Sequence, residues 1–249
     1  MFLQEANVIS VAKKQYFFKL KAHYGIFTSL LMTQLFALLF SAFLGTGQSG
    51  TSIFNVSLNI NYYTGNLIII FTMVWAFTSG ITLNSKTSKD GDFAFVTNRL
   101  TSNLSNIAFL MTATAIAGFT AMLAGSLLKV IVYYYFSVEN LAGSASISLS
   151  ELVLGIIVSI LYVSLFGALG YLVGVLIQMS KIFVFLLPLV FIGLLFIEGR
   201  MQGEGALGQL VKFFALETSP VLFLVKAFVA ITLVYIGSIF LTDKMEVRK

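Results

Sequence analysis

Residue types that support chemistry in many enzymes are absent or rare in this sequence. The 249 residues include no cysteine, one histidine (His23) and 2 prolines. The lack of cysteine excludes disulfides, thiol catalysis and Cys-based metal sites, and a lone histidine cannot build a metal site. The GxSxG, HExxH and P-loop patterns are missing as well. We therefore expect a chain that is not an enzyme, binds no cofactor and does not itself hydrolyse ATP.

Charge is also scarce. Charged residues make up 10% of the chain, against about 25% in a typical soluble domain, whereas 58% of the residues are hydrophobic. A soluble fold of this length cannot keep so much apolar surface out of water. The composition thus excludes a soluble enzyme, a disordered chain and a disulfide scaffold. It predicts an all-α integral membrane protein whose single transmembrane domain covers residues 1–249.

Long apolar runs give the number of membrane spans. A bilayer core needs about 20 apolar residues per helix, and the sequence contains six runs that approach or exceed this length. The fifth is the shortest and contains Pro188, which a membrane helix tolerates. The six expected spans cover residues 25–44, 66–83, 107–136, 152–177, 182–197 and 221–241.

The basic residues predict the orientation of the spans. Eleven of the 15 basic residues fall on one side of this arrangement, and Lys and Arg are enriched in cytoplasmic loops. They are Lys13, Lys14, Lys19, Lys21, Lys86, Lys89, Arg99, Lys181, Lys244, Arg248 and Lys249. Both termini are therefore expected in the cytoplasm. This placement also explains the net charge of +5 without a nucleic-acid partner.

Three stretches outside the spans have amphipathic or mixed composition. Residues 1–21 predict an interfacial helix, since apolar residues recur at three-, four- or seven-residue steps and lysines suit anionic headgroups. The recurring residues are Phe2, Ala6, Ile9, Tyr16 and Leu20. Such a helix either anchors the chain to the surface or couples the first span to a partner. Residues 84–106 predict a cytoplasmic loop that contains a short helix capped by Asp92. Residues 198–219 are too short to span and too apolar for an ordinary loop, which favours a re-entrant or interfacial helix on the outer side.

Small residues within the spans indicate close helix packing. The third span carries small residues at four-residue steps, and the fourth contains a GxxxG pattern. These positions are Ala113, Ala117, Ala121, Gly125, Gly170 and Gly174. They predict either ordinary packing within the chain or a face that moves or dimerises.

Polar residues inside the spans are candidates for a substrate pathway or gate, because such residues are rare in membrane helices. The candidates are Gln34, Lys129, Glu151 and Lys226. Lys129 and Glu151 lie at a similar outer level, so a pair between them is one expectation. Lys226 would either snorkel outward or meet Glu217 or Glu198. The alternative to a gate is that these residues only snorkel or form structural pairs.

The whole layout resembles the permease subunit of an ABC exporter of the ABC-2 type. The features that carry the resemblance are the six spans, the N-terminal helix, the helical loop after the second span and the outer segment before the sixth. The most specific stretch is residues 92–103, which read DFAFVTNRLTSN. The sequence is especially similar to small permeases of Gram-positive bacteria, which implies a multi-pass protein of the bacterial plasma membrane.

The resemblance also implies partners and roles. The loop helix would be a coupling helix that docks on a separate ATPase through Asp92, Phe93, Phe95, Val96 and Arg99. Two permeases, identical or paralogous, would form the pathway with two ATPases, which would bind ATP and Mg. The outer segment would help to close the external side. The substrate would be an amphipathic or hydrophobic peptide, antibiotic or lipid. The alternative reading is a six-helix solute-binding or scaffold subunit without export activity.

Overall fold

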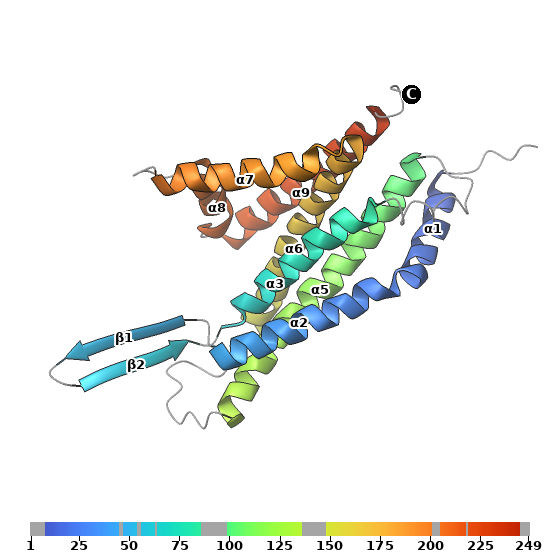
Figure 1. Ribbon diagram of the computed structural model, residues 1–249. Helices are drawn as coiled ribbons and strands as arrows, with labels where there is room; N and C mark the ends of the chain where they lie inside the picture. The colour runs from blue at the N-terminus through green and yellow to red at the C-terminus, as the bar shows by residue number, and fades with distance from the viewer. Residues whose placement is uncertain are drawn as a thin grey trace, which may run out of the picture. The chain divides into compact units, whose positions relative to one another are not determined.

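The chain forms the six membrane-length helices that the sequence predicts (Figure 1). The computed structural model describes residues 8–44, 47–53, 56–62, 64–85, 99–135, 148–200, 205–217 and 219–244. The candidate spans are α2 (Tyr24–Leu44), α3 (Asn66–Leu83), α5 (Arg99–Tyr135), α6 (Leu149–Met179), α7 (Phe183–Arg200) and α9 (Pro220–Lys244). The chain is thus a multi-pass membrane protein by the length and composition of its helices.

The helix ends follow local capping chemistry. At the start of α6, the backbone N–H of Ser148 donates to the Glu151 carboxylate over 3.4 Å, which is half of the capping box expected for a Ser-x-x-Glu sequence. Pro220 is the first residue of α9, where its missing N–H costs no helical hydrogen bond. These local signals extend α6 and α9 slightly beyond the apolar runs that predicted them.

The helix α5 is much longer than the span expected at 107–136. It begins at Arg99 and contains 37 residues, which correspond to about 55 Å of helix at 1.5 Å per residue. The hydrocarbon core of a bilayer is about 30 Å thick. The first two turns of α5 therefore lie in the segment that the sequence predicted to be a polar loop.

Two shorter helices occupy the segments that were expected to be amphipathic. The helix α8 (Ala206–Ala215) contacts both α7 and α9. The helix α1 (Val8–Ala22) shows a different face from the expected one. Its buried residues are Ala12, Gln15 and Lys19, whereas Ile9 of the expected apolar stripe is 71% exposed. Tyr16 and Leu20 of that stripe are half-buried, and Phe2 and Ala6 lie outside the described residues. The side of α1 that the protein covers therefore coincides only in part with the expected apolar stripe.

A β-hairpin lies between α2 and α3, in a chain that the sequence predicted to be all-α. The strands β1 (Gly47–Ile53) and β2 (Val56–Tyr62) pair antiparallel, with Gly47 opposite Tyr62 and Ile53 opposite Val56.

The chain divides into two compact units. The first unit comprises Met1–Tyr16, Ser79–Ala108 and Ala168–Lys249, and the second unit comprises Phe17–Thr78 and Phe109–Gly167.

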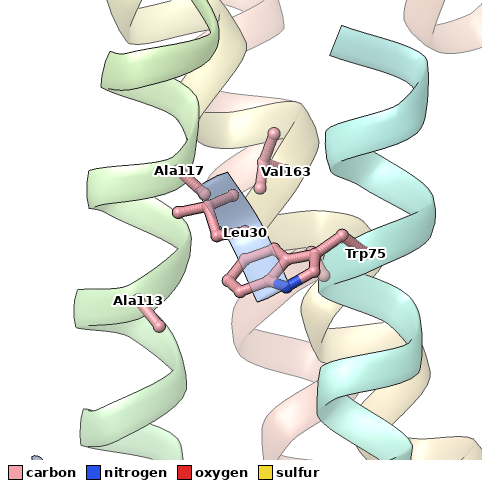
Figure 2. Packing of buried hydrophobic residues seen from close by; sticks show 6 residues of the cluster. Leu30, Trp75, Ala113, Ala117 and Val163 are labelled. Carbon is pink, nitrogen blue, oxygen red and sulfur yellow. The ribbon is translucent and has the colours of Figure 1, made fainter. Parts of the chain in front are cut away.

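The core of the second unit gathers side chains from four helices (Figure 2). Trp75 of α3 lies against Leu30 of α2, Ala113 and Ala117 of α5 and Val163 of α6. The small alanines let the large indole enter between the helices.

Candidate functional site

Gln34 sits at a polar contact between three helices of the second unit. Its side chain is 6% exposed, and its Nε2 donates to the backbone carbonyl of Ala117 over 3.1 Å and to Thr72 Oγ1 over 3.4 Å. Thr72 in turn donates to the Ile68 carbonyl of its own helix. An amide without partners would be costly in a membrane. The contact therefore ties α2 to α3 and α5 rather than leaving Gln34 open to a pathway.

Similar hydrogen bonds connect α5 and α6. The hydroxyls of Thr114 and Ser164 are 3.0 Å apart, and Ser159 Oγ donates to the Gly118 carbonyl over 3.0 Å. A Cβ built on Gly118 would lie 2.6 Å from the Cα of Ile160. Only glycine permits this approach of the two backbones, and the approach brings the Ser159 hydroxyl within reach of its acceptor.

The small-residue positions lie in such contacts. Ala113, Ala117 and Ala121 have no exposed surface. Gly125 faces Gly65, which precedes α3, since a Cβ on Gly125 would lie 3.4 Å from the Gly65 Cα. These four positions therefore serve packing within the second unit. Gly170 is also buried, in α6 of the first unit.

A second polar cluster lies in the first unit, at the two ends of the 86–98 segment. Asn84 follows α3, and its Nδ2 donates to the backbone carbonyl of Tyr171 over 3.1 Å. The Tyr171 hydroxyl donates to Asn103 Oδ1 in α5 over 3.0 Å. Both asparagines are 6% exposed and Tyr171 is fully buried. We call Asn84, Asn103 and Tyr171 the Tyr171 clamp.

Two neighbours shape the Tyr171 clamp. A Cβ on Gly174 would lie 3.0 Å from Asn84 Cβ and 3.1 Å from the Ile81 Cα, so glycine leaves the space that Asn84 occupies. The ring of Tyr235 in α9 packs edge-on against the Tyr171 ring, with centroids 6.0 Å apart. The clamp therefore gathers four helices of the first unit around one tyrosine.

Lys226 belongs to a contact between α8 and α9. Its ammonium pairs with the Glu217 carboxylate, and it also lies over the ring of Phe213, 4.1 Å from the centroid. Lys226 thus meets one of its two expected partners. The side chains are 28% and 16% exposed, so the pair is partly shielded from water. It fixes the end of α8 to the first turns of α9.

Lys129 and Glu151 are not brought together. Both side chains are exposed, and in the part of the chain that the structure describes no ion pair joins them. Glu151 instead accepts the N–H of Ser148 at the start of its own helix. A local helix cap takes the place of the expected Lys129–Glu151 pair, because the cap needs only residues at the start of the same helix.

No family model, curated protein or solved structure matches this chain.

The residues expected to contact an ATPase fall mostly outside the described residues. Asp92, Phe93, Phe95 and Val96 lie there, and so does the side chain of Arg99, whose backbone begins α5. Within the described ranges, no group of three or more His, Asp or Glu side chains could hold a metal ion.

The Tyr171 clamp was not predicted from the sequence. The available signal was a pair of asparagines, Asn84 and Asn103, near the two ends of the 84–106 loop. Buried amides at helix ends need hydrogen-bond partners, so such a pair predicts an acceptor or donor nearby. Nothing in the pattern of α6 singles out Tyr171, because its run is apolar on every side.

Proposed function

We propose that the chain is the membrane-spanning permease subunit of an ATP-driven ABC exporter of the ABC-2 type. It forms the substrate pathway as a dimer, and separate ATPase subunits bind ATP and Mg. The substrate is an amphipathic or hydrophobic peptide, antibiotic or lipid. The protein resides in a bacterial plasma membrane with both termini in the cytoplasm.

The Tyr171 clamp is the observation that carries this proposal. Both ends of the 84–106 loop are bonded to one residue, because Asn84 binds the Tyr171 carbonyl and Asn103 binds its hydroxyl. A force on the loop would therefore act on α3, α5 and α6 together. The unbroken helix from Arg99 to Tyr135 would carry the same displacement along the span. This geometry suits a loop that receives a push from a partner.

The helix α7 supports the dimeric arrangement. Each of its residues lies in the described part of the chain, and none of them is buried. Phe185, Leu189 and Phe196 are 80%, 69% and 71% exposed. A span with no buried side chain is open to contacts with a second permease as well as with lipid.

In the proposed cycle, ATP binding closes the two ATPases and displaces the coupling loop. The two permease halves then change between inward-open and outward-open states. Nucleotide shifts this equilibrium only through its different affinity for the two states. The α8–α9 contact held by Lys226 and Glu217 would keep the outer segment in place beside the external opening.

The docking role is tested with Phe93→Ala plus Arg99→Ala. This double variant is expected to lose ATPase co-purification and ATP-driven export. Phe228→Ala plus Arg200→Ala removes the same residue types from exposed positions away from the loop and is the matched control, with co-purification expected to persist. Undiminished co-purification and transport in the Phe93/Arg99 variant would overturn the docking assignment.

The transmission role is tested separately with Tyr171→Phe. This change removes only the hydroxyl that binds Asn103, so the ATPase should still co-purify while export per ATP hydrolysed falls. Equal export in Tyr171→Phe would remove the clamp from the mechanism. A tightly bound small molecule in place of any ATPase would favour the solute-binding alternative.

A further inference from the structure

The outward side of α1 combines basic and aromatic residues. Lys13, Phe17 and Lys21 follow one another at four-residue steps, and Lys14 and Phe18 form the adjacent row. Residues four apart are neighbours on a helix surface. We call these five residues the basic–aromatic face. The three lysines are exposed, and the two phenylalanines are 52% and 41% exposed.

The opposite side of the same helix is buried. Ala12, Gln15 and Lys19 are 5%, 0% and 1% exposed, and they recur at three- and four-residue steps. The rotation of α1 about its axis is therefore set. It turns one lysine inward and the other three outward beside aromatic rings. An apolar stripe read from the sequence would have turned the helix differently.

The position of α1 along the chain places this face at the membrane boundary. Only His23 separates Ala22, the end of α1, from Tyr24, the start of the first candidate span. The His23 ring packs against Phe109 with centroids 5.6 Å apart, which holds the elbow between the two helices. A helix joined this closely to a span cannot leave the headgroup region at its C-terminal end.

We propose that the basic–aromatic face of α1 binds the anionic phospholipid headgroups of the cytoplasmic leaflet. The helix contains no acidic residue, so its exposed charge is wholly complementary to that surface. Lysine stems extend their ammonium groups to the phosphates while aromatic rings enter the interface. The occupancy of this docked state then depends on the content of anionic lipid. The inference stands whether or not the chain is a permease.

The test uses the full chain in lipid nanodiscs. Because the protein has no cysteine, Ser10→Cys gives a single attachment point for an environment-sensitive fluorophore on the exposed side of α1. The nanodiscs contain phosphatidylcholine alone or phosphatidylcholine with phosphatidylglycerol. With phosphatidylglycerol, we expect blue-shifted emission and quenching by headgroup nitroxides, and we expect added salt to reverse both because it screens exposed charges.

Charge variants identify the surface that responds. Each basic residue near an anionic surface changes the equilibrium constant for docking by a factor of about five. Lys13→Gln plus Lys21→Gln should therefore lower this equilibrium constant about 25-fold. Lys181→Gln plus Lys244→Gln removes two exposed lysines elsewhere and should leave docking unchanged. Lys13→Arg plus Lys21→Arg keeps the charge and should retain docking, which distinguishes a charge effect from misfolding.

Two results would overturn the proposal. The first is the same emission and quenching with and without phosphatidylglycerol, which would mean that lipid charge plays no part. The second is a blue shift that appears only after a co-purified ATPase is added, which would make the face a protein-binding surface.

Discussion

Individual polar residues act in this protein as links between apolar helices. Gln34, Ser159 and Asn84 each donate from a side chain to a backbone carbonyl of another segment. A helical carbonyl is a fixed acceptor in a membrane, where no bulk water competes for it. A single amide or hydroxyl therefore helps to specify which helices meet, together with the shapes of the packed apolar side chains.

Replacing Gln34 by leucine should destabilise the second unit. The change introduces an apolar side chain of similar size and removes the bonds to Ala117 and Thr72. Because an interhelical hydrogen bond in a membrane contributes about 0.6 to 2 kcal/mol, we expect a loss of about 1 kcal/mol. The measurement is the free energy of unfolding in a mixed-micelle titration.

Thr33→Val is the control for that substitution. Among the described residues, the Thr33 hydroxyl bonds only the Ser29 carbonyl of its own helix, so its removal should change the free energy of unfolding much less. Equal losses for the two variants would show that Gln34 does not link helices.

At the scale of elements, helix approach depends on glycine at a few positions. Gly118 of α5 lies so close to Ile160 of α6 that an added Cβ would meet backbone atoms at 2.6 and 2.7 Å. Backbone cannot move aside as a flexible side chain can. The two helices must separate to admit any larger residue, and the Ser159 hydrogen bond would lengthen with them.

Gly118→Ala is therefore expected to lower the free energy of unfolding by about 1 to 3 kcal/mol, the usual cost of overpacking. Gly237→Ala in α9 is the matched control, since nothing lies within 4 Å of a Cβ there. Alanine is the better helix former by about 1 kcal/mol, so this variant should be neutral or more stable. Thermal unfolding in detergent compares the two, and a Gly118→Ala protein as stable as the wild type would contradict the close approach.

The sequence predicted some elements better than others. The six spans and the helices in 1–21 and 198–219 followed from apolar runs and spacing, which are local properties. The hairpin was missed, although Val56, Leu58, Ile60 and Tyr62 alternate with polar residues, which is the pattern of a strand with one apolar face. The Gly, Ser and Thr residues of β1 are more typical of loops than of strands, which obscures this pattern.

At the scale of the whole molecule, orientation is the property that the basic residues predict. The absence of cysteine makes this prediction easy to test with single cysteines and a membrane-impermeant maleimide. Ser148→Cys, before α6, should label in intact cells. Ser180→Cys, after α6, should label only once the membrane is opened. The unmodified chain is the blank, and the reverse pattern would place both termini outside.

The sequence by itself predicted a membrane protein and the six helices, among the described residues, that are long and apolar enough to cross a bilayer. Those properties depend only on the length of apolar runs relative to the bilayer. The one-sided distribution of lysine and arginine predicts an orientation by the same kind of local rule.

Only the tertiary structure decided which polar groups meet. It paired Lys226 with Glu217 and joined Asn84 and Asn103 through Tyr171. The tertiary structure also determined which face of α1 is exposed. A span such as α6 is apolar on every side, so its sequence holds no periodic signal for the face that a neighbour covers. That choice depends on the shapes of all the packed helices at once.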